Sequence, residues 1–295
     1  MTSGRFRPSF LPFLPLLVFL AVGGPQRAGA QPATTDADPV QAWRFPVGER
    51  MEFSVNWGRV RLGEGSVEVE AIDSIDGHDG YRVAMEVWGG PPFFRVQDRQ
   101  VSWIRPQPLS SIRFEQRLSE GSYKRSTRYA FDLEGMTYDR HDLVDSEWRA
   151  RDGETDVPIL EGALDDVSFL FLARLLPLEV GHRYEFDRYF KEDGNPVVIE
   201  VLRREEIRVP AGTFQTIVLR PIIQTDGAFS EDGEAELYLS DDDRRVIVRL
   251  KTSMAVGSGN MFLTHYEPGY GELIPVEDPV TAAPAIPVGT EGGPP

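Results

Sequence analysis

Apolar and polar residues alternate with a period of two through most of the middle of this chain, and this pattern predicts β-strands. Successive side chains of a strand point to opposite faces, so each such run has one apolar face and one polar face. The clearest runs are 51–57, 67–71, 81–87, 129–133 and 246–250. One apolar face per strand is typical of antiparallel sheets that pack on one side only. The sequence therefore predicts a mainly β protein.

Short turn sequences separate the strand-like runs. They are Asp76-Gly77, Asp152-Gly153, Asp193-Gly194-Asn195 and Asp232-Gly233. Their spacing predicts on the order of a dozen strands in an antiparallel meander. A twisted sheet of that size curls or closes, so we expect a large, strongly curved sheet that forms a half-barrel or a closed barrel. A two-sheet β-sandwich is the alternative.

The segment 164–176 (LDDVSFLFLARLL) breaks the alternation. It is apolar around most of its circumference, carries Asp165 and Asp166 near its start, and is followed by Pro177. Acidic residues in the first turn and a proline after the end are helix signals, and a helix apolar on nearly all sides is expected to be buried. We therefore predict one buried helix on an open side of the curled sheet. A buried central strand stays open as the alternative, because periodicity alone does not assign a short apolar run.

The first thirty residues have the organisation of a secretory signal peptide. Arg5 and Arg7 precede an apolar run over 10–22, and Ala28-Gly29-Ala30 is a small-residue cleavage site. The apolar run is shorter than the ~20 residues that a bilayer crossing needs, and no second run of that length follows. We expect residues 1–30 to direct export, to the periplasm or alternatively to the exterior, and we expect no integral membrane segment after cleavage.

The composition divides the remainder into three parts. Residues 31–42 are small and polar and are interpreted as a flexible lead-in. Residues 43–267 hold the strand-like runs and are predicted to form a single β domain. Residues 268–295 contain too little apolar content to pack and are expected to form a disordered tail rich in proline and glycine.

The overall composition argues against several classes of partner. The chain has no cysteine, which excludes disulfides, thiol nucleophiles and thiolate metal sites. It has 31 basic and 47 acidic residues, a formal net charge of −16 at pH 7. Such a surface repels phosphate, so we predict no nucleic-acid binding, and the same repulsion disfavours an anionic membrane surface. The richest basic stretch, 113–128, is interpreted as the solvated face of a sheet.

The sequence contains no catalytic, cofactor or metal signature. The histidines are never two to four residues apart, so they do not form a zincin-type motif. They are His78, His141, His182 and His265. P-loop, dinucleotide and G-x-S-x-G motifs are also absent. The acidic run 241–243 is interpreted as a hairpin turn rather than a calcium site, because Arg244 and Arg245 follow it directly and no EF-hand spacing does. We therefore predict that the protein is not an enzyme and needs no cofactor.

One loop, 87–94 (VWGGPPFF), combines glycine and proline with three large aromatic residues, Trp88, Phe93 and Phe94. In the first interpretation these rings cap an apolar cavity or contact a lipid or a partner protein. In the second, they fold inward and close the core. These three residues are the candidate ligand or partner residues, and the sequence predicts no others.

Several segments also carry a family pattern. They are 45–53 (FPVGERMEF), 57–58, 63–65, 165–169 with Arg174, 209–214 (VPAGTF), 238–245 (YLSDDDRR) and 257–259. In this order they resemble the DUF3108 family of exported bacterial proteins, although Tyr238 stands where the family more often has tryptophan. The resemblance implies export and a β architecture. It implies no reaction and no catalytic residues, since the family has no established activity.

Two functions therefore stay open at this stage. The first is a non-catalytic binding module of the cell envelope that holds an apolar or lipid-like ligand inside the curved sheet. The second is a structural or assembly protein that meets an envelope protein partner through its surface or its sheet edges. An envelope hydrolase is a distant third, which would need histidines and carboxylates clustered in a pocket.

Overall fold

The computed structural model describes residues 45–91, 93–223, 235–253, 258–270 and 286–287. The expected signal peptide, the lead-in, the Asp232-Gly233 turn and most of the expected tail lie outside the described residues.

Within these residues the chain forms sixteen β-strands, one α-helix and one short 3-10 helix. The first group of strands is β1 (Val47–Trp57), β2 (Val60–Ile75), β3 (His78–Gly89), β4 (Val96–Pro106), β5 (Leu109–Glu120), β6 (Tyr123–Asp132), β7 (Thr137–Val144), β8 (Glu147–Ala150) and β9 (Val157–Pro158). The helix α1 (Asp166–Leu175) follows. The second group is β10 (His182–Phe186), the 3-10 turn η1 (Glu192–Gly194), β11 (Val197–Val209), β12 (Gly212–Ile222), β13 (Glu236–Ser240), β14 (Ile247–Ser253), β15 (Ser258–Tyr270) and β16 (Ile286–Pro287).

All of these strands belong to one antiparallel sheet. Its order is β16-β10-β11-β12-β13-β14-β15-β1-β2-β3-β4-β5-β6-β7-β8, with β9 paired to β7. The chain therefore makes one meander from β1 to β8, crosses over through α1, and makes a second meander from β10 to β15. The last long strand, β15, then pairs with the first, β1, over most of their lengths. This pairing joins the two meanders into a single surface.

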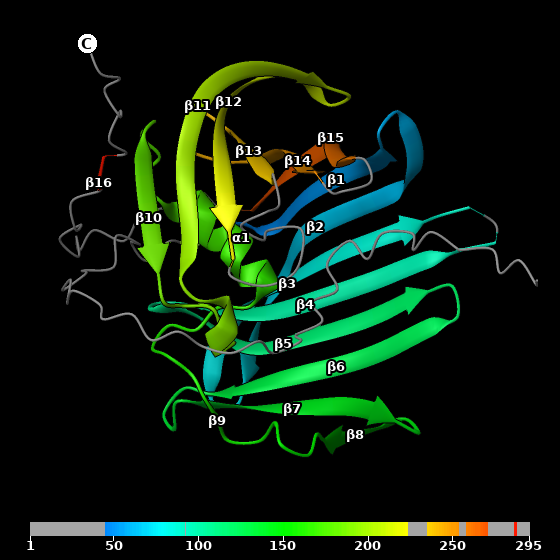
Figure 1. Ribbon diagram of the computed structural model, residues 1–295, viewed down its shortest axis with the longest axis vertical. Helices are drawn as coiled ribbons and strands as arrows, with labels where there is room; N and C mark the ends of the chain where they lie inside the picture. The colour runs from blue at the N-terminus through cyan, green and yellow to red at the C-terminus, as the bar shows by residue number, and fades with distance from the viewer. Residues whose placement is uncertain (1–44, 92, 224–234, 254–257, 271–285, 288–295) are drawn as a thin grey trace, which may run out of the picture.

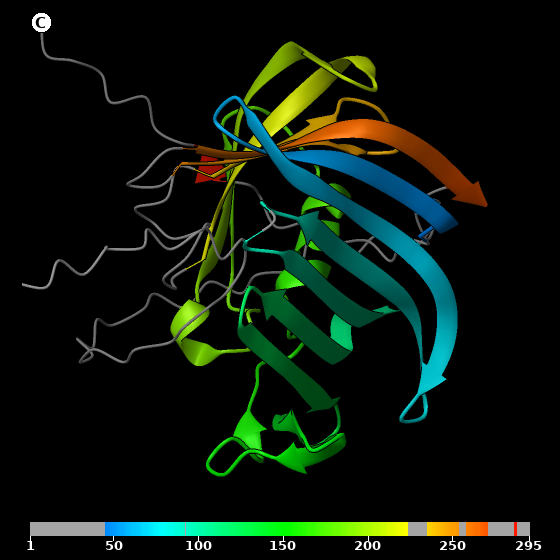
Figure 2. The ribbon, with the colours of Figure 1, turned by 90° about the vertical axis from the view of Figure 1, so that its right-hand side faces the viewer.

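The sheet curves strongly, and its two arms enclose α1 on the concave side (Figure 1; Figure 2). Among the described strands its two edges are β16 and β8, which do not pair with each other. The sheet is thus open and has the half-barrel form. The closed barrel and the two-sheet sandwich are not formed.

The predicted alternation sets the two faces of the sheet. In β1, Met51, Phe53 and Val55 are buried in the core, whereas Arg50 and Glu52 point to the opposite face. The period-two pattern therefore identified the core-facing residues of this strand.

The β2–β3 turn also follows its sequence signal. Asp76 and Gly77 have φ values of 50° and 82°, and a tight hairpin turn of this kind requires positive φ at both central positions.

The predicted helix is present, and the strand alternative was wrong. Asp165 caps α1 by accepting hydrogen bonds from the backbone N–H groups of Val167 and Ser168 at 2.8 and 2.9 Å. The Ser168 hydroxyl accepts in turn from the backbone N–H of Asp165 at 2.8 Å, which completes a capping box. All ten residues of α1 are buried, as its apolar circumference predicted.

The core is continuous from α1 to both arms of the sheet. Phe171 of α1 meets Phe45 with ring centroids 4.9 Å apart, and Phe190 meets Tyr129 of β6 at the same distance. Most of the apolar surface on the concave side is therefore used in packing against the helix and its neighbours. No helix in the described part of the chain is long and apolar enough to cross a membrane.

Candidate functional site

The three candidate aromatic residues have different environments. Trp88 is half-buried at the end of β3, where its Nε1–H donates to Glu64 at 3.2 Å. Phe94 is also half-buried, and its ring lies over Gly121 in the β5–β6 hairpin, 3.0 Å from where a Cβ of that glycine would stand. Phe93 is 81% exposed. Two of the rings therefore fix the loop to neighbouring hairpins, and the third points outward.

The backbone of this loop depends on Gly90. Its φ of +87° is a conformation that residues with a side chain rarely adopt. A Cβ at this position would also stand 2.1 Å from the carbonyl oxygen of Phe94. The glycine allows the tight turn that presents Phe93 to solvent. Whether this loop contacts a ligand or a partner stays a prediction.

A line of polar residues, all buried except the half-buried Gln116, lies on the concave face of β4 and β5, and sequence reasoning missed it. We call it the inner polar strip, and it consists of Asp98, Gln100 and Ser102 of β4 with Gln116 and Glu120 of β5. The pairing of β4 with β5 places these residues side by side, because Gln100 is opposite Gln116 and Val96 is opposite Glu120. Gln100 also stands opposite the core residue Met85 of β3, which places it on the concave face.

The inner polar strip runs from the helix to the end of the sheet where β4 begins. At the helix end, the hydroxyl of Ser102 donates to the Asp165 carboxylate at 2.6 Å. Gln116 approaches Asp166 at 3.5 Å. At a strand rise of about 3.3 Å per residue, Asp98 lies roughly 13 Å from Ser102 toward the open end. The strip therefore connects the N-terminus of α1 to the rim of the half-barrel.

Two acceptor atoms of the inner polar strip have no hydrogen-bond donor. The side-chain carbonyl oxygen of Gln100 and Oε1 of Glu120 are buried without a partner. Their residues are only 4% and 8% exposed. A buried acceptor left in this state destabilises a protein by about 1–3 kcal/mol, so most native structures avoid it.

Two carboxyl groups of the inner polar strip are in contact at its open end. Burial, the charge of Asp98 and a hydrogen bond between the two side chains together raise the pKa of Glu120 to about 7. Burial also raises the pKa of Asp98, although the backbone N–H of Ser119 donates to it at 2.8 Å and opposes that shift. Of the two groups, Glu120 therefore has a pKa close to neutral pH.

A second polar cluster surrounds the N-terminus of α1. The Asp165 carboxylate accepts from the hydroxyl of Ser111 at 2.7 Å in addition to Ser102. Burial raises its pKa and these hydrogen bonds oppose the rise. Burial likewise raises the pKa of Asp166 to about 6, opposed by the hydroxyl of Tyr189, which donates at 2.7 Å. These groups are well partnered, which is the pattern of a structural network.

A buried ion pair ties the other end of α1 to the sheet. Arg174 donates to both carboxylate oxygens of Glu49 on β1 at 2.8 and 2.7 Å. The same guanidinium donates to the backbone carbonyls of Arg245 at 3.0 Å and Arg244 at 2.9 Å. Both side chains of the pair are essentially unexposed. The contact holds the helix, β1 and the β13–β14 turn together.

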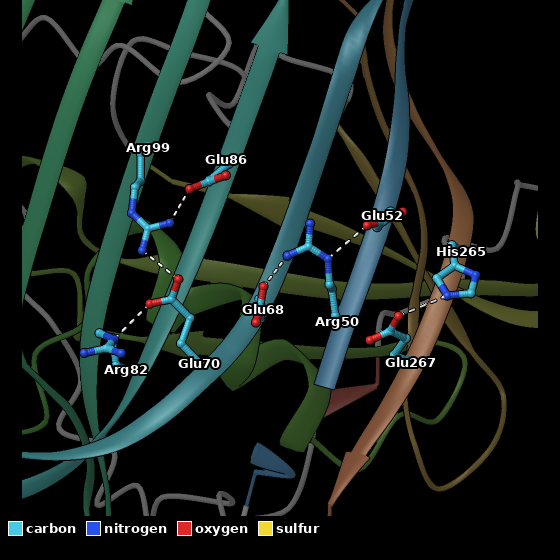
Figure 3. A network of polar contacts seen from close by, with 9 residues as sticks. All are labelled: Arg50, Glu52, Glu68, Glu70, Arg82, Glu86, Arg99, His265 and Glu267. Atoms are coloured by element: carbon cyan, nitrogen blue, oxygen red, sulfur yellow. Dashed lines mark hydrogen bonds and ion pairs between the residues drawn. The ribbon is translucent and has the colours of Figure 1, made fainter. Parts of the chain in front are cut away.

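The convex face of the central strands carries a separate network of ion pairs (Figure 3). Arg99 of β4 and Arg82 of β3 both pair with Glu70 of β2, at 2.6 and 2.8 Å. Arg50 of β1 pairs with Glu52 at 2.9 Å and also with Glu68. These side chains are partly exposed and already partnered, so the network is interpreted as cross-strand support for the sheet.

The remaining polar motifs do not converge on the inner polar strip. The acidic run 241–243 forms the β13–β14 turn, where Asp242 accepts from the backbone N–H of Arg244 at 3.0 Å. The histidines lie on separate elements: His78 at the start of β3, His141 on β7, His182 on β10 and His265 on β15. In the described part of the chain no group of three or more histidines and carboxylates is placed to hold a metal ion.

The family pattern extends over most of the chain. The family described as "Protein of unknown function (DUF3108)" matches residues 52–264. This chain belongs to the DUF3108 family. The segments that suggested the resemblance include the buried contacts of α1, since Glu49, Asp165, Asp166 and Arg174 all lie in them. No curated protein matches the sequence at a significant level.

Three solved structures share a distant likeness to this DUF3108 protein. A hypothetical protein from Chlamydia trachomatis is 8% identical, with a TM-score of 0.34 over 79% of this chain and 92% of its own. A protein from Parabacteroides distasonis is 9% identical, with a TM-score of 0.32 over 78% and 100%. A protein with a YmcC-like fold from Bacteroides fragilis is 11% identical, with a TM-score of 0.28 over 77% and 99%. Likenesses of this strength support no conclusion about this chain.

A signal for the inner polar strip was present in the sequence. Asp98, Gln100 and Ser102 occupy alternate positions of β4 and therefore point to the same face of the sheet. The residues of the neighbouring strand β3 on that face are apolar. The pattern of a single strand does not say which of its faces meets the core, so the strip became visible only through the pairing with β3.

Proposed function

We propose that this DUF3108 protein is a non-catalytic binding module of the cell envelope that holds a small amphipathic ligand against the inner polar strip. The observation that carries the proposal is the pair of buried acceptors without donors, on Gln100 and Glu120. A ligand that donates hydrogen bonds to these atoms removes the free-energy cost of leaving them unpaired.

The packing of the core narrows the chemistry of this ligand. Apolar side chains on the concave side already pack against α1, so a purely apolar molecule gains little there. The inner polar strip offers acceptors and an acidic pair instead. The favoured ligand therefore carries hydroxyl, amide or amino donors at the strip and directs its apolar part toward the rim, where Trp88, Phe93 and Phe94 lie.

The proposed location in the envelope rests on residues 1–30, which have the features of an export signal. The proposed absence of catalysis rests on the environment of the carboxyl pair. Asp98 and Glu120 lie beside Gln100 and core residues, and a hydrolase of the kind considered above would need a histidine at this point.

Native mass spectrometry tests the proposal. The full chain is expressed with its own N-terminal segment and then purified. We expect a non-covalent small-molecule adduct in the wild type. Gln100→Leu keeps the approximate size of the side chain and removes the acceptor, so adduct occupancy should fall by roughly tenfold. Gln97→Leu is the matched control, because Gln97 lies exposed on the same strand, and it should retain the adduct.

The ligand proposal is wrong if the wild type carries no adduct. It is also wrong if Gln100→Leu and Gln97→Leu retain the adduct equally. The first result would favour the alternative, a structural or assembly protein that works through its surface.

A further inference from the structure

Four hairpin connections lie in a row at one end of the sheet. In an antiparallel meander every second connection falls at the same end, and here these are β1–β2, β3–β4, β5–β6 and β7–β8. They follow one another down the right-hand side of Figure 1, and this side faces the viewer in Figure 2. We call these connections, with the strand ends that flank them, the hairpin rim. Neighbouring connections lie two strands apart, so the row spans roughly 30 Å.

Each connection of the hairpin rim carries an exposed large apolar side chain. They are Val60 at 61% exposure, Phe93 at 81%, Tyr123 at 44%, and Leu143 and Val144 at 39% and 42%. Five of the nine exposed large apolar side chains in the described part of the chain therefore lie on this one end. Single exposed apolar residues need no explanation, but one on every connection of a row marks an interaction surface.

Basic side chains accompany these apolar tips. Arg59, Arg95 and Lys124 are exposed at the first three connections and form no ion pair with the described residues. Arg61 and Arg149 are also exposed, and each pairs with an acidic neighbour. Three successive tips of the hairpin rim thus combine an apolar side chain with an unpaired positive charge.

The β7–β8 connection of the hairpin rim also carries two exposed acidic residues, Asp145 and Glu147, which pair with Arg149, so the unpaired positive charge lies on the first three connections. The opposite end of the same sheet is richer in acidic residues. Exposed acidic residues occupy its β2–β3 and β6–β7 connections, namely Asp76, Asp79, Asp132 and Glu134. The net charge of −16 predicted that an anionic surface would be repelled. The fold instead gathers unpaired basic side chains on the first three connections of the hairpin rim, so this part of the rim can approach such a surface.

We propose that the hairpin rim docks onto an anionic lipid bilayer surface. Large apolar and aromatic side chains enter the boundary between headgroups and acyl chains, and adjacent Arg and Lys side chains pair with lipid phosphates. The first three connections of the hairpin rim each have an apolar and a basic side chain, and neighbouring connections are about 10 Å apart. The inference goes beyond the proposed ligand site and does not depend on it.

Phe93 is the most exposed of the large apolar side chains on the hairpin rim, at 81%. It is also the largest of them apart from Tyr123, which is less exposed. Burying an apolar side chain contributes free energy roughly in proportion to the area removed from water. Phe93 is therefore the residue of the rim expected to contribute most to docking.

Co-sedimentation of the full, purified chain with vesicles tests the proposal. We expect binding to phosphatidylglycerol vesicles, weak binding to phosphatidylcholine vesicles, and a decrease as salt increases. Phe93→Ser should weaken binding by roughly tenfold or more, since it removes a fully inserted aromatic side chain. Ile72→Ser is the matched control: Ile72 is 57% exposed on β2, away from the rim, and its loss should leave binding unchanged.

A charge reversal tests the basic component separately. Arg95→Glu removes one phosphate partner and adds a repulsive charge, so we expect at least about a fivefold loss. Arg105→Glu, at the opposite end of the same strand, should have no effect. Far-UV circular dichroism of each variant confirms that the fold is retained.

The proposal is overturned if vesicle binding is absent, is insensitive to lipid charge, or is equally affected by the rim and control variants. A photo-cross-linker at position 93 that labels an envelope protein while the vesicles remain unbound would assign the rim to a protein partner instead. Adduct retention in native mass spectrometry reports on the ligand site alone, so failure of one idea is distinguishable from failure of the other.

Discussion

Replacing Arg174 by methionine should destabilise the fold more than any other single removal of an ion pair described above. The guanidinium is fully buried, makes two hydrogen bonds to Glu49, and donates to the carbonyls of Arg244 and Arg245. Methionine retains the apolar stem and removes all four donated hydrogen bonds. The variant thus isolates the charge and its hydrogen bonds from most of the packing.

The magnitude follows from what is left behind. Without Arg174 the Glu49 carboxylate stays buried, with the Tyr266 hydroxyl at 3.2 Å as its remaining side-chain partner. Removing one member of a buried pair destabilises by about 3–5 kcal/mol, and two carbonyls lose their donor as well. A domain is stabilised by only about 5–15 kcal/mol in total, so we expect the midpoint of denaturation to fall markedly.

Equilibrium urea unfolding, followed by tryptophan fluorescence, measures this loss. The double variant Glu49→Met with Arg174→Met removes both charges together, so it should be more stable than Arg174→Met alone and give a coupling energy of about 2 kcal/mol or more. Arg99→Met is the matched control on the convex face, where the partly exposed pairs with Glu70 and Glu86 predict a loss below about 1 kcal/mol. Equal losses in Arg174→Met and Arg99→Met would refute the reasoning.

Two further predictions concern buried carboxyl groups. The folded-state pKa of Glu120, about 7, lies above its ordinary 4.5, so the folded chain binds more protons and loses stability as pH rises between these values. Glu120→Gln should reduce this loss of stability by about 1–3 kcal/mol. The measurement is the free energy of urea unfolding at pH 5 and at pH 8. The same change between these pH values in the wild type and in the variant would contradict the prediction. Asp165→Ala removes the helix cap and leaves the hydroxyls of Ser102 and Ser111 without their acceptor, so it should destabilise by at least about 2 kcal/mol. Asp165→Asn can still cap the helix and should lose much less; a similar loss in both variants would speak against the capping role.

Much of the local structure was predictable because its signals are short-range. Alternation identified the core-facing residues of β1, and Asp76-Gly77 marked a turn whose backbone has the positive φ values expected of it. The apolar segment 164–176 predicted α1 and its burial. Each of these features depends on residues that lie close to one another in the sequence.

The candidate site was predictable only in part, for a physical reason. The aromatic loop was visible because glycine and proline stand beside Trp88, Phe93 and Phe94. The inner polar strip was not, because a polar residue on a strand is read as solvent-facing until a neighbouring strand shows otherwise. The burial of Gln100 can be recognised only from the structure, where it is opposite the core residue Met85.

What the sequence determined by itself was the type of the main elements, the buried face of strands with a clear apolar alternation such as β1, and the resemblance to the family to which the chain belongs. Tertiary structure decided which elements meet. Glu49 and Arg174 are 125 positions apart, and β1 pairs with β15 from the far end of the domain. Alternation specifies a face and leaves the partner open, because any antiparallel neighbour with a matching apolar face satisfies it. The order of strands in the folded sheet therefore brought four hairpins together into a single rim on an acidic protein. Each of these hairpins has at least one exposed apolar residue, and three of them have an unpaired basic residue.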